Sequence, residues 1–334
     1  MTPERITVER TTLASRAGLT VGAVALLALV TLPAWSDAAS MRRLVEFIGL
    51  LALAQMWNLL AGYAGLISIG QQAYVGVGAY ALVVLADDLG VDPFVSVALA
   101  GVVAALVALP TAALVFRFQG GYFAVGTWAV AEVFRLLVAN TGALGRGTGR
   151  TLKAVFPLAR ETRELVTYAL AVALGVAALV GVYAFVRSRL GLGLMAVRDG
   201  EGASETLGID VFRTKLIVYV LAAFGTGATG ALIYLNLLRV SPDAAFSINW
   251  TAASIFIVVI GGLGTLEGPL VGAVLFFVLR ELLADYGSWY MIVLGALAVG
   301  VMLAYPRGLW GLVTDRWDVR VFPVQRRLRL DEEP

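Results

Sequence analysis

The sequence predicts an all-α protein, a polytopic bundle of about ten transmembrane helices. Hydrophobic residues make up 60% of the 334 residues and charged residues only 14%, which lies far outside the range of soluble globular domains. The charges are bunched, and they leave charge-free runs at 17–35, 47–86, 94–116, 165–186, 216–238, 244–266 and 286–306. Each run is long enough to cross a membrane, because about 20 helical residues span the hydrocarbon layer.

The first run, 17–35, is expected to be a retained span. Arg5, Arg10 and Arg16 precede it and small residues follow it, as in a secretory signal peptide. Its 19 charge-free residues exceed the apolar core of a signal peptide, which is about 7–15 residues long. We therefore expect 1–334 to form a single transmembrane domain that begins with a polar segment, 1–16.

The second run, 47–86, holds 40 residues without a charge, so the chain must turn back within it. Gly62, Gly65 and Gly70 mark the expected helix break, shortly after Asn58. Polar backbone groups freed at such a break must be buried in protein or line a cavity. These four residues are therefore candidates for a transmembrane pathway. Close packing between helices is the alternative role of each glycine.

A helix is expected from about residue 122, after an acidic turn at 87–92, the span 94–116 and a tight turn. Glu132 and Arg135 lie in this helix, with Glu132 about a dozen residues from its start and hence near the middle of the membrane. The two residues share a helix face, so they either neutralise one another or face a pathway.

Two polar segments separate the next spans. Residues 140–164 are expected to form a loop, because they hold four glycines and Pro157, and they carry five bases against two acids. Residues 187–215 carry five bases and four acids, yet apolar residues recur at Leu194, Val197 and Leu207. That mixture is typical of a short helix that lies on another protein; a solvated loop is the alternative.

A second helix break is predicted by Gly261, Gly262 and Gly264, with helices at about 267–284 and 287–305 after it. One Gly-interrupted segment in each half of the chain suggests inverted structural repeats with a substrate route between them. Glu267 lies at the turn, where a helix N-terminus favours a carboxylate.

Several blocks resemble the LivM-type permease subunits of branched-chain amino acid ABC transporters. They are the segment Asn58 to Tyr80, the helix Tyr122 to Arg135, the block Gly-Leu-Gly-Leu-Met-Ala-Val-Arg-Asp at 191–199 with Ala203 and Leu207-Gly208-Ile209, the segment Ile260 to Ala273, and Tyr-Pro-Arg-Gly-Leu at 305–309. The resemblance extends from about residue 44 to residue 310.

The resemblance implies a membrane-spanning subunit that moves branched-chain amino acids and is powered by other chains. Its partners would be cytoplasmic ATP-binding subunits, a second permease subunit of related fold and an external solute-binding protein. Residues 187–215 would be the cytoplasmic loop that contacts the ATPase. The matching positions of that loop in this sequence are Met195, Arg198, Asp199, Ala203, Leu207 and Gly208.

The distribution of bases predicts the orientation in the cell membrane. The N-terminal segment 1–16, residues 187–215 and the tail 307–334 are rich in arginine, so both termini and this loop are expected in the cytoplasm. The acidic turn at 87–92 is then outside, and so is the basic loop 140–164. The basic loop contradicts the rule, and it indicates either a miscounted helix or an outer surface that receives an acidic partner.

The composition also excludes several kinds of chemistry. The only lysines, Lys153 and Lys215, do not follow a glycine, so no phosphate-binding loop is present and ATP chemistry must come from another chain. The absence of histidine and cysteine removes the Ser-His-Asp triad and the usual metal, haem and iron–sulfur ligands, so neither catalysis nor a cofactor is expected. A net charge of +2 does not indicate nucleic acid binding.

Three alternative functions are considered. The same machine would serve equally for urea, short amides or another small solute. An ion-coupled secondary transporter would also have broken helices and inverted repeats, but it needs coupling-ion sites, for which Glu132 is the one suited carboxylate near the midplane. An intramembrane enzyme is the least favoured interpretation.

Overall fold

The computed structural model describes residues 6–9, 13–283, 289–317, 321–322 and 327–330. These residues form an all-α bundle, which confirms the predicted fold class. Within them, seven helices are long and apolar enough to cross a membrane: Ala38–Tyr63, Pro93–Val115, Gly121–Asn140, Arg160–Arg187, Val211–Leu237, Pro242–Gly261 and Ile292–Arg316. The chain is therefore a multi-pass membrane protein.

Every predicted span contains a helix. The elements are α1 (Leu13–Thr31), α2 (Ala38–Asn58), α3 (Gln72–Val83), α4 (Pro93–Val115), α5 (Gly121–Asn140), α6 (Arg160–Arg187), α7 (Arg189–Asp199), α8 (Glu201–Thr206), α9 (Val211–Leu237), α10 (Pro242–Ala245), α11 (Ile248–Gly261), α12 (Gly268–Leu283), α13 (Trp289–Ala304) and α14 (Gly308–Trp317). Two short antiparallel ladders pair β1 (Ile6–Glu9) with β4 (Arg327–Leu330), and β2 (Arg150–Thr151) with β3 (Arg239–Val240).

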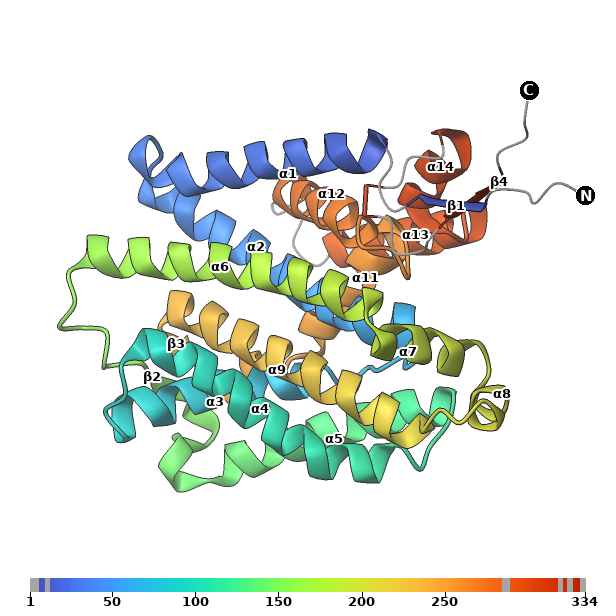
Figure 1. Ribbon diagram of the computed structural model, residues 1–334. Helices are drawn as coiled ribbons and strands as arrows, with labels where there is room; N and C mark the ends of the chain where they lie inside the picture. The colour runs from blue at the N-terminus through green and yellow to red at the C-terminus, as the bar shows by residue number, and fades with distance from the viewer. Residues whose placement is uncertain (1–5, 10–12, 284–288, 318–320, 323–326, 331–334) are drawn as a thin grey trace, which may run out of the picture.

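The long helices run between two ends of the bundle (Figure 1). One end carries α7, α8 and the β1–β4 ladder, and we call it the α7 end. At the opposite end α2 and α6 begin, and Arg42 lies 3.2 Å from Glu164 there. Of the N-terminal bases, Arg5 and Arg10 lie outside the described residues, as does part of the tail 307–334.

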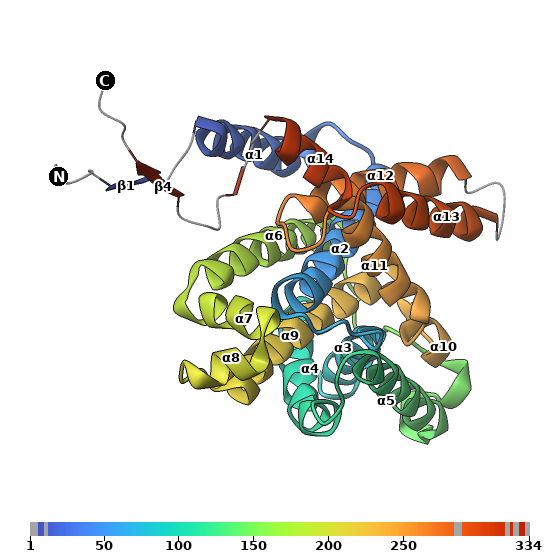
Figure 2. The ribbon, with the colours of Figure 1, turned by 90° about the vertical axis from the view of Figure 1, so that its right-hand side faces the viewer.

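α2 and α9 form the centre of the bundle. Figure 2 views the molecule from its α7 end and shows α5, α6, α11 and α13 arranged around them. The most apolar stretch of the span Ala38–Tyr63, which contains α2, is 83% buried, and that of α9 is 67% buried, against 22% for α5. α3 crosses α9 so closely that a Cβ on Gly78 would lie 1.9 Å from the Gly227 carbonyl oxygen. Small residues therefore let the helices approach, as expected where lipid gives no hydrophobic drive.

The basic 140–164 segment and the acidic turn contact each other at the opposite end. Arg150 donates two hydrogen bonds of 2.6 Å to the Asp88 carboxylate. Asp87 accepts hydrogen bonds from the backbone N–H groups of Lys153 and Ala154. The acidic turn therefore neutralises part of the basic segment, and the two lie at the same end of the bundle.

Candidate functional site at the two helix breaks

The first break begins where α2 continues as a π-helical turn, Leu59–Tyr63. Gly65 then adopts φ +71°, a left-handed conformation that favours glycine. The chain folds back along α2, so that the Trp57 indole N–H donates to the Ser68 carbonyl at 2.8 Å. α3 starts only at Gln72. This geometry confirms the break predicted at Gly62 to Gly70.

Buried hydroxyls satisfy the backbone amides that the break frees. The Ile69 N–H donates to Thr127 Oγ1 of α5 at 3.2 Å, and the Gln72 N–H donates to Thr251 Oγ1 of α11 at 3.0 Å. Such partners are required in a membrane, where water does not compensate an unpaired amide. The sequence analysis did not single out either threonine, because a hydroxyl among mainly apolar neighbours is the one signal that marks each of them.

The second break lies between α11 and α12, where Gly262 and Gly264 have φ +138° and +74°. It packs directly against the first break. Asn58 Oδ1 accepts from the Gly264 N–H at 2.9 Å, and Asn58 Nδ2 donates to the Thr265 carbonyl at 2.7 Å. A Cβ on Gly62 would lie 2.6 Å from the Gly264 nitrogen. The contact brings together candidates that are about 200 residues apart in sequence.

Other candidate glycines have packing roles. A Cβ on Gly70 would lie 2.1 Å from the Thr127 carbonyl oxygen of α5. A Cβ on Gly261 would lie 1.8 Å from the Gly268 carbonyl oxygen at the start of α12. At both positions the neighbouring backbone excludes a side chain, as the packing alternative predicts. The pathway role of these glycines stays a prediction.

Residues 187–215, the coupling segment, fold into α7 and α8 instead of an irregular loop. Leu194 and Val197 are buried and fix α7 on the bundle. Leu207, in contrast, is 77% exposed. Ala203 and Gly208 are also exposed, and Met195 is half-buried. The segment therefore has one face on its own bundle and one uncovered face that carries a large apolar side chain.

Arg198 lies at the end of α7 and turns toward the breaks. Its Nη1 donates to the Gly62 carbonyl at 2.9 Å, and its Nε donates to Asp199 Oδ1 at 2.9 Å. Asp199 is otherwise exposed, with 68% of its side chain accessible.

Glu132 and Arg135 form the predicted ion pair, with Arg135 Nη2 at 2.6 Å from Glu132 Oε1. Arg135 Nη1 also lies 2.6 Å from Asp243 Oδ1 of α10, a partner that the sequence did not indicate. Glu132 lies past the midpoint of α5, toward the opposite end. Its side chain is 42% exposed, so the charges of this ion pair are only partly covered.

Glu267 precedes α12 and is buried. Its Oε1 accepts from the Phe322 N–H at 2.8 Å. Burial raises the pKa of the Glu267 carboxyl above its ordinary value, although backbone hydrogen bonds offset part of this shift. The carboxyl group thus holds Phe322 beside the start of α12.

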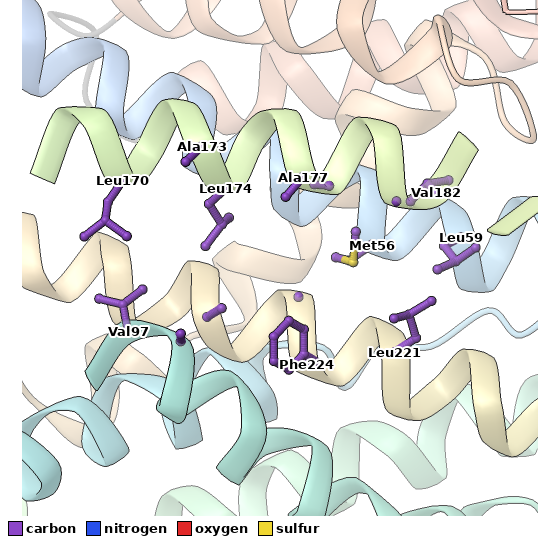
Figure 3. Close-up of a pocket in the computed structure, with 15 residues that line it drawn as sticks. Met56, Leu59, Val97, Leu170, Ala173, Leu174, Ala177, Val182, Leu221 and Phe224 are labelled. Carbon is purple, nitrogen blue, oxygen red and sulfur yellow. The ribbon is translucent and has the colours of Figure 1, made fainter. Parts of the chain in front are cut away.

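A cavity of about 360 Å³ lies between α2, α4, α6 and α9 (Figure 3). Its lining is apolar and includes Met56, Leu174, Leu221 and Phe224. None of the candidate residues lines it, and it offers no partner for the charged ends of an amino acid. We do not assign it to the pathway.

The fold is that of a multi-pass membrane protein, and interrupted helices whose backbone is buried in protein are a feature of membrane transport proteins. A family profile described as "Branched-chain amino acid transport system / permease component" matches residues 40–302. The chain belongs to this family of permease components of branched-chain amino acid transport systems.

Individual relatives agree with the family. The chain is 29% identical over 278 residues to the high-affinity branched-chain amino acid transport system permease protein LivM of Salmonella typhimurium, and 28% identical to LivM of Escherichia coli. Each match covers 75% of this chain and 65% of the relative's length. A probable LivH permease of Methanocaldococcus jannaschii is 24% identical over 266 residues, which cover 73% of this chain and 83% of LivH. No solved structure matches.

Proposed function

We propose that this chain is the membrane-spanning permease subunit of an ABC importer that translocates branched-chain amino acids. The observation that carries the proposal is the family match over residues 40–302, which includes both helix breaks and the coupling segment. The LivM relatives carry the same solute class in their names.

The energy is proposed to come from separate cytoplasmic ATP-binding subunits. The chain has no phosphate-binding loop, so a partner must bind the nucleotide. The exposed face of the coupling segment supports this docking, because Leu207 is 77% exposed at an end that lies outside the apolar span. A second permease subunit of related fold and an external solute-binding protein complete the proposed complex.

In the proposed orientation the α7 end faces the cytoplasm of a cell-membrane protein. The segments 1–16, 187–215 and 307–334 carry most of the arginines, which favours the cytoplasmic side. The β1–β4 pairing supports placing both termini on one side. The acidic turn and α10 then face outside.

The two breaks are proposed to belong to the moving part of the pathway. ATP binding on the partner would bias the bundle between an outward-open and an inward-open packing, because only one of them fits the closed ATPase. Glu132 and Arg135 are proposed to face the route or the second permease. A charged side chain that is only partly covered within a span needs water or protein beside it, not lipid.

The test is uptake by proteoliposomes that hold the chain with its ATPases, the second permease and the solute-binding protein. ATP-dependent leucine uptake that unlabelled urea does not reduce is the expected result. ATP-driven urea uptake without leucine uptake would select the alternative solute class. Leucine uptake driven by a sodium or proton gradient without ATP would reject the ABC mechanism in favour of a secondary transporter.

A further inference from the structure

Arg198 occupies an unusual place for a residue of the coupling segment. α7 packs on the bundle through Leu194 and Val197, and the guanidinium of Arg198, the penultimate residue of this helix, is directed at the first break. Nη1 of Arg198 donates to the Gly62 carbonyl at 2.9 Å, across 136 residues of sequence. Gly62 lies in the π-helical turn that ends α2.

The Gly62 carbonyl is a favourable acceptor for the cationic Arg198 side chain. The last carbonyls of a helix lack intrahelical partners and carry the negative end of the helix dipole, so a cation is favoured there. Gly65 leaves room for the side chain, since a Cβ at that position would lie 3.1 Å from Arg198 Cγ. Asp199 holds the same guanidinium through Nε at 2.9 Å.

The contact point is also where the two breaks meet. A Cβ on Gly264 would lie 3.2 Å from the Gly62 carbonyl oxygen and 3.9 Å from Arg198 Nη1. Asn58 joins Gly264 to α2 through a hydrogen bond of 2.9 Å. A displacement of α7 therefore acts on a carbonyl of the first break that lies against the second break.

We propose that Arg198 is the positioning residue that ties the coupling segment to the two helix breaks, and that it does not bind the ATPase itself. The inference rests on the proposed function, in which an ATPase covers the exposed face of α8. Movement of that partner shifts α7 as a rigid unit, and Arg198 transmits the shift to the Gly62 carbonyl. The packing of the breaks then follows the nucleotide state of the partner.

The experiment uses the assembled complex and a reporter cysteine. Ile67 lies within the first break and is 54% exposed, and the chain has no native cysteine, so Ile67→Cys gives one labelling site. Its rate of reaction with a maleimide is measured with and without ATP, beside leucine uptake, ATP hydrolysis and co-purification of the ATPase. The variants are Arg198→Ala and Arg198→Lys. Arg189→Ala is the matched control, because Arg189 is an exposed arginine at the other end of α7.

We expect Arg198→Ala to keep the ATPase bound and hydrolysing ATP, and to lose the effect of ATP on labelling of the reporter cysteine. Uptake should fall at least about tenfold, the change expected for one lost charge-assisted hydrogen bond. Arg198→Lys should recover part of the response, because an ammonium still donates to the carbonyl. Arg189→Ala should respond to ATP like the unsubstituted chain.

Two results would overturn the inference. In one, Arg198→Ala loses ATPase co-purification, which would make Arg198 a docking residue. In the other, labelling of the reporter cysteine still responds to ATP in Arg198→Ala, whether or not uptake or thermal stability falls, which would leave only a structural role. Failure of the proposed function itself would appear differently, as absent ATP-driven uptake by the unsubstituted complex.

Discussion

At the residue scale, Asn58 has the clearest structural role. Its position in a Gly-rich segment singled it out in the sequence, but its partners at Gly264 and Thr265 did not follow from any local pattern. The same holds for Arg135, whose second partner Asp243 lies on another helix. Spacing along one helix predicts neighbours at i+3, such as Glu132, because helix geometry is local. Contacts between distant segments depend on tertiary packing.

We expect Asn58→Leu to destabilise the protein. Leucine has a similar size, but it leaves the Gly264 N–H and the Thr265 carbonyl unpaired in a buried contact. Each unpaired buried group costs about 1–3 kcal/mol. Thermal unfolding in detergent should therefore shift to a clearly lower temperature. Asn249→Leu, at an exposed position on α11, is the control, and equal melting of the two variants would contradict the role assigned to Asn58.

Glu267 gives a pH-dependent prediction. Burial raises its pKa in the folded protein above the ordinary value of 4.5, so the fold favours the neutral carboxyl. The stability that this raised pKa contributes is fully present at a pH below the pKa of Glu267 in the unfolded chain. It is lost as the pH rises through the pKa of Glu267 in the folded protein. Glu267→Gln keeps an oxygen for the Phe322 N–H and has no charge. The melting temperature of the variant, relative to that of the unsubstituted protein, should rise as the pH goes from about 4 to 8. A fall in this difference over the same range would refute the raised pKa of Glu267.

At the element scale, the spans were predictable because lipid demands long apolar helices. The residues at which the helices begin were less predictable. α2 begins at Ala38, before the charge-free run, since Arg42 and Glu46 are paired with Glu164 and Arg280. α6 likewise begins at Arg160, within the expected loop. Ion pairs that neutralise the first turns of a helix are not visible in a count of charges.

The coupling segment provides a prediction at this scale. α8 exposes Ala203, so Ala203→Arg should leave the bundle stable but clash with an ATPase docked on this face and desolvate a charge there. Co-purification of the ATPase and uptake should be lost together. Glu205→Gln on the same exposed helix is the control. Asp199→Asn is unsuited to that purpose, because Asp199 holds Arg198.

Two outcomes of this experiment would count against the docking surface. Normal co-purification and uptake by Ala203→Arg would mean that α8 is a solvated segment. A lower melting temperature of the variant without any partner present would mean that Ala203 packs on its own bundle.

At the scale of the whole molecule, the sequence predicted two breaks but not that they touch. The glycine pattern shows where a helix is interrupted, whereas the contact depends on α2, α11 and α12 converging at the α7 end. The inverted-repeat relation of the two halves stays a prediction. So do the limits of the terminal segments, parts of which lie outside the described residues.

The placement of the α7 end in the cytoplasm is the claim on which docking, coupling and direction of transport all depend. It is tested most directly by single-cysteine labelling in intact cells, since the chain has no native cysteine. Ala203→Cys marks α8, and Leu89→Cys marks the opposite end. Leu89 is 66% exposed, and its replacement leaves the Asp88 pair with Arg150 intact. A membrane-impermeant maleimide added outside should label the Leu89→Cys variant in intact cells, and the Ala203→Cys variant only after the cells are permeabilised. Labelling of Ala203→Cys in intact cells, with Leu89→Cys protected from the reagent, would contradict the account.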